Sequence, residues 1–404
     1  MTKYVCGSCF GDVALSDFAS SNAEENECDF CGATSTQPIA APIAKVGAYI
    51  NECLKEEYDD AANWLPYESS EGGWQGTWWD GSDLLDEVGL ELPNDDGTLS
   101  RAIANEIDDC AWCEKNPFGL NDAEEGRFNW DRFCKTVMHE RRFFFSDHGG
   151  AAGEVLSPGE TLEQIFDFAE QVGLFVVLPV GTKMFRARHQ PQGKVYKTAE
   201  DLGSPPIERA TQTNRMSPPG IVMLYTSCDA ETALRETARR VGTYAVGRFE
   251  TKRDAMILDL TRLPSIPSLF EPIPDSVPYR PRRVLTFLHH VAAEISKPIA
   301  RDEKIHINYV PTQVVTEYVR ARQLADNSFV EGIQFDSAVH AGHPSYVLFA
   351  TAENMIGAIG GPFGPPDDMW IDLLDVQVVE VNEACLTGFR DETAELEGSG
   401  RAEG

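Results

Sequence analysis

The sequence predicts an α+β protein, and three observations support this prediction. Two CxxC pairs lie within residues 1–38, and the next stretch carries apolar residues at three- and four-residue spacing. The second half mixes short strand patterns with helix patterns and lacks regular βαβ alternation. We therefore expect parts at residues 1–38, 39–155 and 156–390, followed by a short, disordered acidic tail at 391–404.

Charge and composition restrict the classes of function. Of the 404 residues, 42% are hydrophobic, and the formal net charge is −31. This charge repels phosphate backbones, so nucleic acid is not expected as a partner, although a few arginines can still hold a small anion. The longest apolar run, residues 174–180, is too short for a membrane span, and the amino terminus resembles no signal peptide. We expect a cytoplasmic protein with reduced cysteines and no membrane partner.

The first part predicts a zinc ribbon. The pairs Cys6/Cys9 and Cys28/Cys31 are separated by the length of a short hairpin and can place four thiolates around one tetrahedral Zn²⁺. This part has too little apolar sequence for a core of its own, so the metal would supply the folding energy. Four cysteine ligands leave no open position, which makes the zinc structural. The alternative is a flexible leader with unligated cysteines.

The second part predicts mostly helix. Ile43, Val46, Ile50 and Leu54 form one buried stripe, and similar stripes follow at residues 99–110 and 130–141. A glycine- and tryptophan-rich loop at 72–79 is expected to pack on a neighbouring domain or to present a binding surface. A third pair, Cys110/Cys113, followed by Cys134 and His139, leaves a second metal site open; small core cysteines on a helix are the favoured interpretation.

The third part predicts a larger α+β domain. After a flexible linker at Gly149–Gly153, Ser157 and Pro158 begin a helix that runs to about Gln171. The patterns then predict strands at 176–188, 221–227, 244–251, 256–260, 332–337 and 345–349, and helices at 230–240, 283–296 and 314–324. Because neither a GxGxxG turn nor a Walker A sequence occurs, a Rossmann domain or P-loop is not supported.

Six short motifs in this part occur in a distinctive order. They are Phe185-Arg186, Asn214-Arg215, Leu224–Ser227 with Ala233–Glu236, Tyr309–Gln313, Gly332–Ser337 and Leu348-Phe349. In this order they resemble the RES domain, which is named for an Arg, a Glu and a Ser. Asn214, Met216-Ser217 and Phe335 depart from the residues usual in that family. The helical part, with residues 130–133 and 141–144, more loosely resembles the HEPN-like domain that precedes some RES domains.

The resemblance implies a fold and an activity. RES domains resemble ADP-ribosyltransferase toxins in fold, and characterised members degrade NAD+ as toxins paired with antitoxins. It implies an NAD+ glycohydrolase or phosphorylase that depletes cellular NAD+ in a toxin–antitoxin or anti-phage defence setting. An antitoxin or trigger protein is then an expected partner. The helical part lacks the spacing of HEPN ribonucleases, which place four residues between an Arg and a His, since Cys134 lies five residues before His139.

The resemblance also assigns residues to the chemistry. Nicotinamide leaves NAD+ as a neutral molecule, so the difficult species is the oxocarbenium-like ribose, which a carboxylate stabilises. Glu236 is the expected carboxylate, and Glu231 is the alternative. The non-catalytic interpretation of Glu236 is a surface salt bridge with Arg240.

Other residue types suit the rest of NAD+. Arg186 and Arg215 suit the two phosphates, and Arg188 is an alternative to Arg186. Tyr225 is expected either to stack on the nicotinamide ring or to belong to the core. Ser337 is expected to hold the ribose or the carboxamide, or else to be a strand-end hydroxyl satisfied by backbone.

Three expectations concern histidines and the role of the amino-terminal half. His289, His290 and Glu294 look like a metal trio, but on an amphipathic helix one histidine is expected in the core and the other outside. His340 and His343 are expected in a turn or at a pocket mouth. The amino-terminal half is expected to control the RES domain. ADP-ribosyl transfer to a macromolecule and non-catalytic nucleotide recognition are the alternative functions.

Overall fold

A computed structural model of the chain describes residues 2–145, 156–273, 277, 280–297, 302–356 and 368–389. The expected linker at 149–153 and tail at 391–404 lie outside these residues. The chain divides into two compact units, called unit 1 (Met1–Glu125 and Ser265–Thr286) and unit 2 (Gly126–Pro264 and Phe287–Gly404). Among the described helices, none combines the length and apolar character needed to cross a bilayer.

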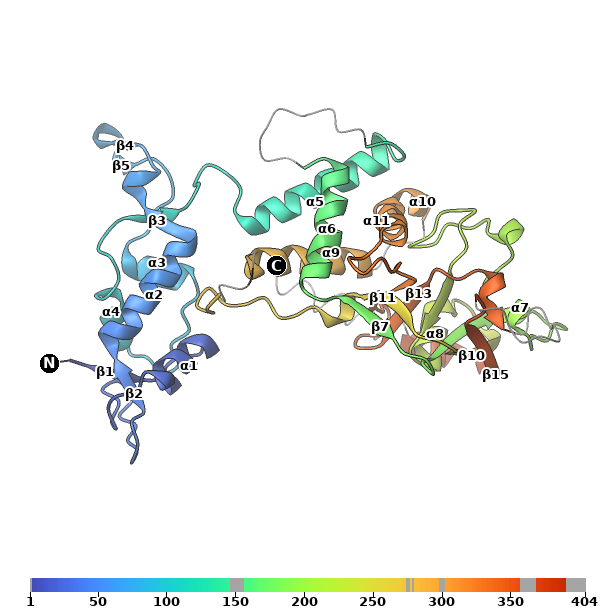
Figure 1. The fold of residues 1–404 in the computed structure, drawn as a ribbon, viewed down its shortest axis with the longest axis horizontal. Coiled ribbons are helices and arrows are strands. Elements are labelled where there is room, and N and C mark those ends of the chain that lie inside the picture. Colours follow the sequence, from blue (N-terminus) through green and yellow to red (C-terminus); the bar gives the residue numbers. More distant parts are fainter. Residues whose placement is uncertain are drawn as a thin grey trace. The chain divides into compact units, whose positions relative to one another are not determined.

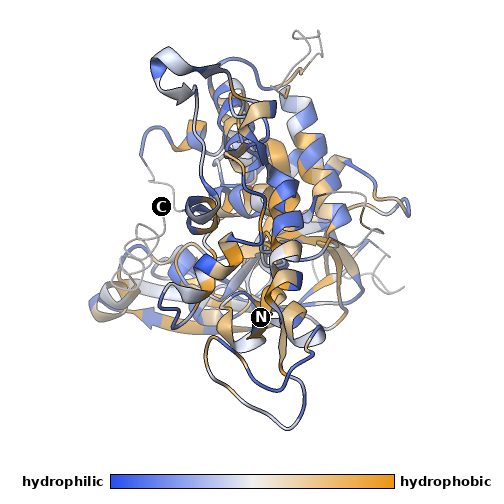
Figure 2. Cartoon of the chain, turned by 90° about the vertical axis from the view of Figure 1, so that its left-hand side faces the viewer, coloured by the Kyte–Doolittle hydropathy of each residue, from blue (hydrophilic) through white to orange (hydrophobic). Residues whose placement is uncertain are grey.

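Unit 1 is a small α+β body around α2 (Figure 1). Its helices are α1 (Val13–Ser21), α2 (Ile43–Glu57), α3 (Gly81–Glu87) and α4 (Thr98–Ala104). Its short antiparallel strand pairs are β1 (Tyr4–Cys6) with β2 (Ala40–Pro42), β3 (Tyr58–Asp60) with β6 (Trp112–Glu114), and β4 (Tyr67–Glu68) with β5 (Gly73–Trp74). As predicted, α2 buries the stripe of Ile43, Val46, Ile50 and Leu54. The helices carry both hydrophilic and hydrophobic residues, as amphipathic helices do (Figure 2).

Two predictions about this region were wrong. Residues 1–38 are not a part separate from α2, because α1 lies between the CxxC pairs and Cys6, Cys9 and Cys28 belong to the same buried core as α2. The stripe at 99–110 is not one helix, because α4 ends at Ala104 and β6 follows at Trp112. Cys113 therefore lies on a strand, where it packs against Ala61 and Leu65.

A segment from the second half of the chain completes the core of unit 1. Ser265–Thr286 belongs to this unit, and the Phe270 side chain is 3% exposed within its core. The Tyr49 hydroxyl of α2 donates a hydrogen bond to the Phe270 carbonyl over 2.7 Å. The fold of unit 1 thus requires residues that lie far from it in the sequence.

Unit 2 is built on a nine-stranded mixed sheet with the order β14-β15-β10-β8-β9-β13-β12-β11-β7 (Figure 1). The strands are β7 (Phe175–Leu178), β8 (Lys183–His189), β9 (Leu224–Ser227), β10 (Gly242–Thr251), β11 (Ala255–Asp259), β12 (Gly332–Asp336), β13 (Pro344–Leu348), β14 (Met355–Ile356) and β15 (Ile371–Val381). The β11–β12 and β14–β15 pairs are parallel and the others antiparallel. The predicted α+β class is confirmed.

The helices of this part are α6 (Pro158–Gln171), α7 (Ala199–Leu202), α8 (Ala230–Thr237), α10 (Ile305–Asn308) and α11 (Val310–Ala321), while α5 (Asp122–His139) and α9 (Pro281–Ser296) begin in unit 1. The predicted start of α6 is confirmed by a capping box between Ser157 and Glu160. Ala233 and Leu234 of α8 pack with Ala187 of β8 and Tyr244 of β10. This contact brings α8 onto the centre of the sheet.

Several boundaries in unit 2 differ from the prediction. The expected strand at 176–188 is two strands, because the chain turns at Gly181, whose φ is +83°. α8 ends at Thr237 rather than Arg240, and α11 begins at Val310, since Pro311 fits the first turn of a helix. The prediction missed β15, which pairs with β10 along its whole length.

Candidate active site

The candidate residues come from the middle of the sheet of unit 2. Arg186 lies on β8, Tyr225 on the neighbouring β9, Glu236 on α8, and Ser337 directly after β12. β8 and β9 are joined by a single residue pair, Phe185 with Ser227, whereas β9 and β13 pair over four residues. The sheet is therefore weakly joined at the two strands that carry Arg186 and Tyr225.

Ser337 and Glu236 are in direct contact. The Ser337 hydroxyl donates a hydrogen bond to Glu236 Oε1 over 2.7 Å, and Ser337 is only 5% exposed. The surface ion pair between Glu236 and Arg240, which was the non-catalytic interpretation of Glu236, is not formed among the described residues. Arg240 instead contacts His189. The alternative carboxylate, Glu231, is exposed and pairs with Arg235 over 2.6 Å. Of the two glutamates, only Glu236 contacts Ser337.

The start of α8 explains how Glu236 is held. The Asp229 side chain caps the helix by accepting a hydrogen bond from the Thr232 amide over 2.8 Å. On the inner face, Ala233 and Leu234 are buried. Because the helix is fixed at its first turn and along its buried face, Glu236, near the end of the helix, is directed to Ser337.

Arg186 and Tyr225 lie close enough to affect each other's ionisation. Burial, and next the charge of Arg188, lowers the pKa of Arg186 to about 10, so the guanidinium keeps its charge at neutral pH. It donates to the Gly203 carbonyl over 2.6 Å. Burial raises the pKa of Tyr225 to about 12, even though Ser217, Met216 and Arg186 act in the opposite direction. The phenol thus stays neutral, and its oxygen is fixed by Ser217 Oγ at 2.9 Å.

Arg215 lies in the loop before β9 and is held by the Tyr309–Gln313 motif. The Gln313 amide donates to the Asn214 carbonyl over 2.7 Å, and the Thr312 hydroxyl donates to the Arg215 carbonyl. The Arg215 guanidinium contacts the Ile295 carbonyl and lies 6.0 Å from the Tyr309 ring centroid. The motif therefore positions the loop that carries Arg215, whereas Arg186 lies on β8. Arg188, the alternative to Arg186, is exposed and donates to the Asp201 carbonyl.

The side chains of Cys228, Asp229 and His343, called the second cluster, lie beside Ser337, and the sequence reasoning missed them. Cys228, Asp229 and His343 bring their ligand atoms together, and His340 stacks on His343 with ring centroids 3.7 Å apart. Burial, and next Asp229, raises the pKa of Cys228 to about 12, so the metal-free thiol is not a nucleophile at neutral pH. The adjacent Cys228-Asp229 pair after a motif strand was the available signal. His340 and His343 lie in the turn before β13, which is one of the two positions predicted for them.

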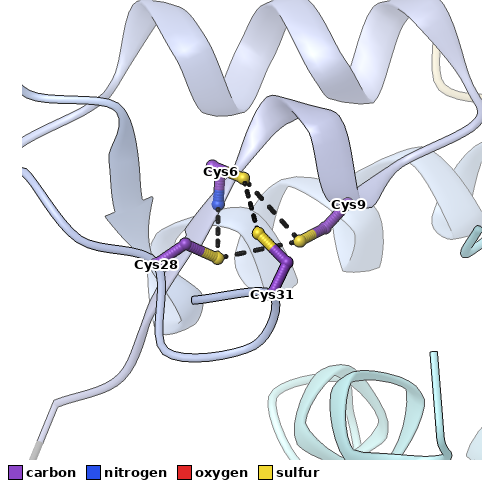
Figure 3. A group of neighbouring side chains, drawn as sticks. All are labelled: Cys6, Cys9, Cys28 and Cys31. Carbon is purple, nitrogen blue, oxygen red and sulfur yellow. Dashed lines mark hydrogen bonds between the residues drawn. The ribbon is translucent and has the colours of Figure 1, made fainter. Parts of the chain in front are cut away.

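In unit 1 the four predicted cysteines converge (Figure 3). The sulfur of Cys6 lies 3.7 Å from that of Cys9 and 3.5 Å from that of Cys31, and the Cys9 and Cys28 sulfurs are 3.7 Å apart. A tetrahedral Zn²⁺ with four thiolates requires sulfur–sulfur distances of about 3.8 Å, so the cluster is close enough to bind a metal.

Backbone contacts also suit this cluster to a cation. Burial alone would raise the pKa of Cys28, but hydrogen bonds from the backbone amides of Cys31, Phe30 and Cys6 hold it at about 7. Burial and the neighbouring thiols raise the pKa of Cys6 to about 11. At Gly7, a Cβ atom would lie 2.6 Å from the Ser16 carbonyl oxygen. The tight turn between Cys6 and Cys9, which lies against α1, therefore requires glycine.

The other sites left open by the sequence have no metal-like grouping among the described residues. Cys110, Cys113, Cys134 and His139 do not converge. Nor do His289, His290 and Glu294: His289 contacts the Pro264 carbonyl at 2.8 Å, while His290 Nε2 is buried without a partner in the described structure. In the tryptophan-rich loop, Trp79 packs on the core of unit 1, and Trp78 remains exposed.

Two models of known protein families match parts of the chain. A model of the HEPN/RES N-terminal domain 1 matches residues 21–150, and a model of the RES domain matches residues 183–366. The second match contains Arg186, Arg215, Tyr225, Glu236 and Ser337. No curated protein and no solved structure matches the chain.

Proposed function

Because the chain is a RES-domain protein with a HEPN/RES N-terminal domain, we propose that its RES domain cleaves NAD+ between nicotinamide and ribose. The observation that carries this proposal is the 2.7 Å hydrogen bond between Ser337 and Glu236, which joins two of the three residues for which the family is named. The third, Arg186, lies on the central strand β8 with its charge retained at neutral pH.

The residue types account for the proposed step. The bond between the nicotinamide nitrogen and ribose C1′ breaks, its electron pair stays on nitrogen, and the positive pyridinium becomes neutral nicotinamide. Glu236 stabilises the positive charge that develops on the ribose. Ser337 fixes the orientation of the Glu236 carboxylate, and its hydroxyl is proposed to contact the ribose as well. Water then adds at C1′ and loses a proton, which gives ADP-ribose; phosphate in place of water gives the phosphorylase reaction.

Substrate binding is assigned to the remaining candidates. The guanidinium groups of Arg186 and Arg215 suit the two phosphates of NAD+, because planar, charged donors bind phosphate oxygens in pairs. Tyr225 suits the nicotinamide ring, since its hydroxyl is already fixed by Ser217 and its ring cannot rotate freely. These groups would provide binding, and Glu236 the chemistry.

The metal of the four-cysteine cluster is proposed to be Zn²⁺ with a structural role. The sulfur spacing fits tetrahedral coordination, and four protein ligands leave no position for a substrate. Three of the cysteines are buried in the core of unit 1, so the ion would stabilise that unit.

An unrestrained enzyme of this kind would deplete the NAD+ of its own cell. We therefore propose that an antitoxin or trigger protein restrains it, in a toxin–antitoxin or anti-phage defence setting in the cytoplasm. The support is the RES family match together with a separate amino-terminal domain that contributes no candidate catalytic residue.

The test is to incubate the purified full chain with NAD+ and to quantify nicotinamide, ADP-ribose and ADP-ribose 1″-phosphate by chromatography, with and without phosphate. Nicotinamide release by the wild type and its loss in Glu236→Gln are expected. Radiolabel transferred from NAD+ to protein or nucleic acid would instead indicate an ADP-ribosyltransferase. Unchanged NAD+ under all conditions would reject the enzymatic proposal and favour nucleotide recognition.

A further inference from the structure

The second cluster consists of Cys228, Asp229 and His343 and joins three parts of unit 2. Cys228 follows β9, Asp229 caps α8, and His343 ends the loop before β13. Their ligand atoms all lie within 4.8 Å of one another. In this structure they are held together by hydrogen bonds: Asp229 Oδ2 accepts from His343 Nδ1 over 2.7 Å and from Cys228 Sγ over 3.1 Å.

The spacing of these atoms fits a transition metal. Sulfur, nitrogen and oxygen ligands of a tetrahedral Zn²⁺ lie about 3.3–3.6 Å apart. Here the oxygen–nitrogen and oxygen–sulfur distances are 2.7 and 3.1 Å, and the sulfur–nitrogen distance is 4.0 Å. Side-chain shifts of a few tenths of an ångström would therefore reach the required geometry. A thiolate, an imidazole and a carboxylate together favour zinc over magnesium or calcium, which prefer oxygen ligands.

Neighbouring residues orient two of the three ligands. The other oxygen of Asp229, Oδ1, accepts from the Thr232 amide over 2.8 Å, so the helix cap survives while Oδ2 is available to a metal. The Thr232 hydroxyl contacts both Asp229 Oδ2 at 2.8 Å and His340 Nδ1 at 2.7 Å, and the His340 ring stacks on His343. Such contacts around the ligands raise metal affinity by fixing their orientation.

We propose that Cys228, Asp229 and His343 bind one Zn²⁺ with solvent at the fourth position. The side chains of His343 and Asp229 are 44% and 35% exposed, so an ion can enter and a water can remain bound. On binding, the Cys228 thiol loses its proton to solvent, and the His343 proton moves from Nδ1 to Nε2. The metal replaces the protons that now link the three side chains.

The position of this site gives it a structural consequence. The His343 carbonyl accepts from the Ser337 amide over 3.3 Å, and Asp229 caps the helix that carries Glu236. An ion bound at the second cluster would therefore tie loop 338–343 to the start of α8. Hydrogen exchange in that loop should slow when zinc is bound.

The experiment counts metal on the full chain. Protein dialysed against a mild chelator is titrated with Zn²⁺ and, separately, with Co²⁺, and bound metal is measured by mass spectrometry and by thiolate-to-cobalt absorption. Wild type is expected to take up one tight equivalent at the four cysteines and a second, weaker one. Cys228→Ser and His343→Ala should weaken the second equivalent by about 100-fold or more and leave the first unchanged.

Matched variants separate ligand loss from general damage. Cys385→Ser and His306→Ala change the same residue types in unit 2, outside the cluster, and should keep both equivalents. Asp229→Asn retains helix capping but loses the anionic ligand, so it should fold normally and still lose the second equivalent. A wild type that binds only one equivalent, or an Asp229→Asn protein that binds as the wild type does, would overturn the proposal. Metal counts do not depend on NAD+ turnover, so the two proposals fail separately.

Discussion

The hydroxyl of Ser337 donates to Glu236 Oε1 over 2.7 Å, although the two residues are 101 positions apart in the chain. The contact depends on the sheet, because Ser337 directly follows β12, and Glu236 is positioned by the packing of α8 on β8 and β10. A carboxylate held by a buried hydroxyl is oriented before a substrate arrives, which is the condition for electrostatic stabilisation of a developing charge.

Glu236→Gln should retain NAD+ binding and lose turnover by about 100-fold or more, since the amide keeps the size and loses the charge. Nicotinamide release measures turnover, and calorimetry of NAD+ measures binding. Glu231→Gln is the matched control because Glu231 is exposed and paired with Arg235. Wild-type turnover in Glu236→Gln would show that another group stabilises the ribose.

Ser337→Ala should lower kcat by about tenfold, because one hydrogen bond of about 1.4 kcal/mol no longer orients Glu236. KM is expected to rise only if the hydroxyl also contacts the ribose. The control is Ser345→Ala, which removes a buried hydroxyl bonded to Ser227 over 3.1 Å. Equal losses of kcat in both variants would point to general loosening of the sheet rather than to a role for Ser337.

The resemblance of the motifs to the RES domain predicted that Glu236 and Ser337 belong to one site, and the structure brings their side chains into contact. The sequence could not predict the second cluster, since Asp229 and His343 are 114 residues apart and only the β9–β13 pairing brings them together. Local patterns also missed β15. Its residues are mostly half-exposed or exposed and include Asp372, Asp375 and Glu380, so its strand character comes from pairing with β10.

The four-cysteine cluster should hold one tightly bound zinc. Cys9→Ser is expected to lose it and to destabilise unit 1 by on the order of 5 kcal/mol, because metal binding and folding are coupled. Metal analysis and the urea midpoint of the full chain measure both effects. A fragment of residues 1–38 is not a suitable sample, since these cysteines share a core with α2. Cys53→Ser, a partly buried cysteine of α2 outside the cluster, should keep the zinc.

Stability should fall on acidification because of His290. Burial lowers its pKa below the ordinary 6.5, and its Nε2 has no hydrogen-bond partner in the described structure. The unfolded chain takes up a proton as the pH drops below about 6.5, whereas the folded chain resists it. The contribution of neutral His290 is therefore full above pH 6.5 and is lost as the pH falls through the lowered pKa. Urea unfolding between pH 8 and 5 should show a shallower decline in His290→Leu than in the wild type or in the exposed control His306→Leu.

Substitution of Phe270 can test whether the amino-terminal half controls the RES domain. Phe270 lies inside the RES match, yet its side chain is 3% exposed in the core of unit 1, where Tyr49 holds its carbonyl. Phe270→Ala should therefore destabilise unit 1 by about 3–5 kcal/mol. Hydrogen exchange should then become faster in α2 and stay unchanged in β13 of unit 2.

The same variant should change NAD+ consumption if the amino-terminal half controls the RES domain, because no candidate site residue is altered. It is preferable to the fragment 154–404, which would expose Phe270 and Leu269 to water. Phe118→Ala is the control, as Phe118 is 70% exposed in unit 1. Faster NAD+ loss would indicate that intact unit 1 restrains the enzyme, and slower loss that it activates it. If α2 loses protection while NAD+ consumption equals that of the control, unit 1 does not control the RES domain and serves its folding or solubility alone.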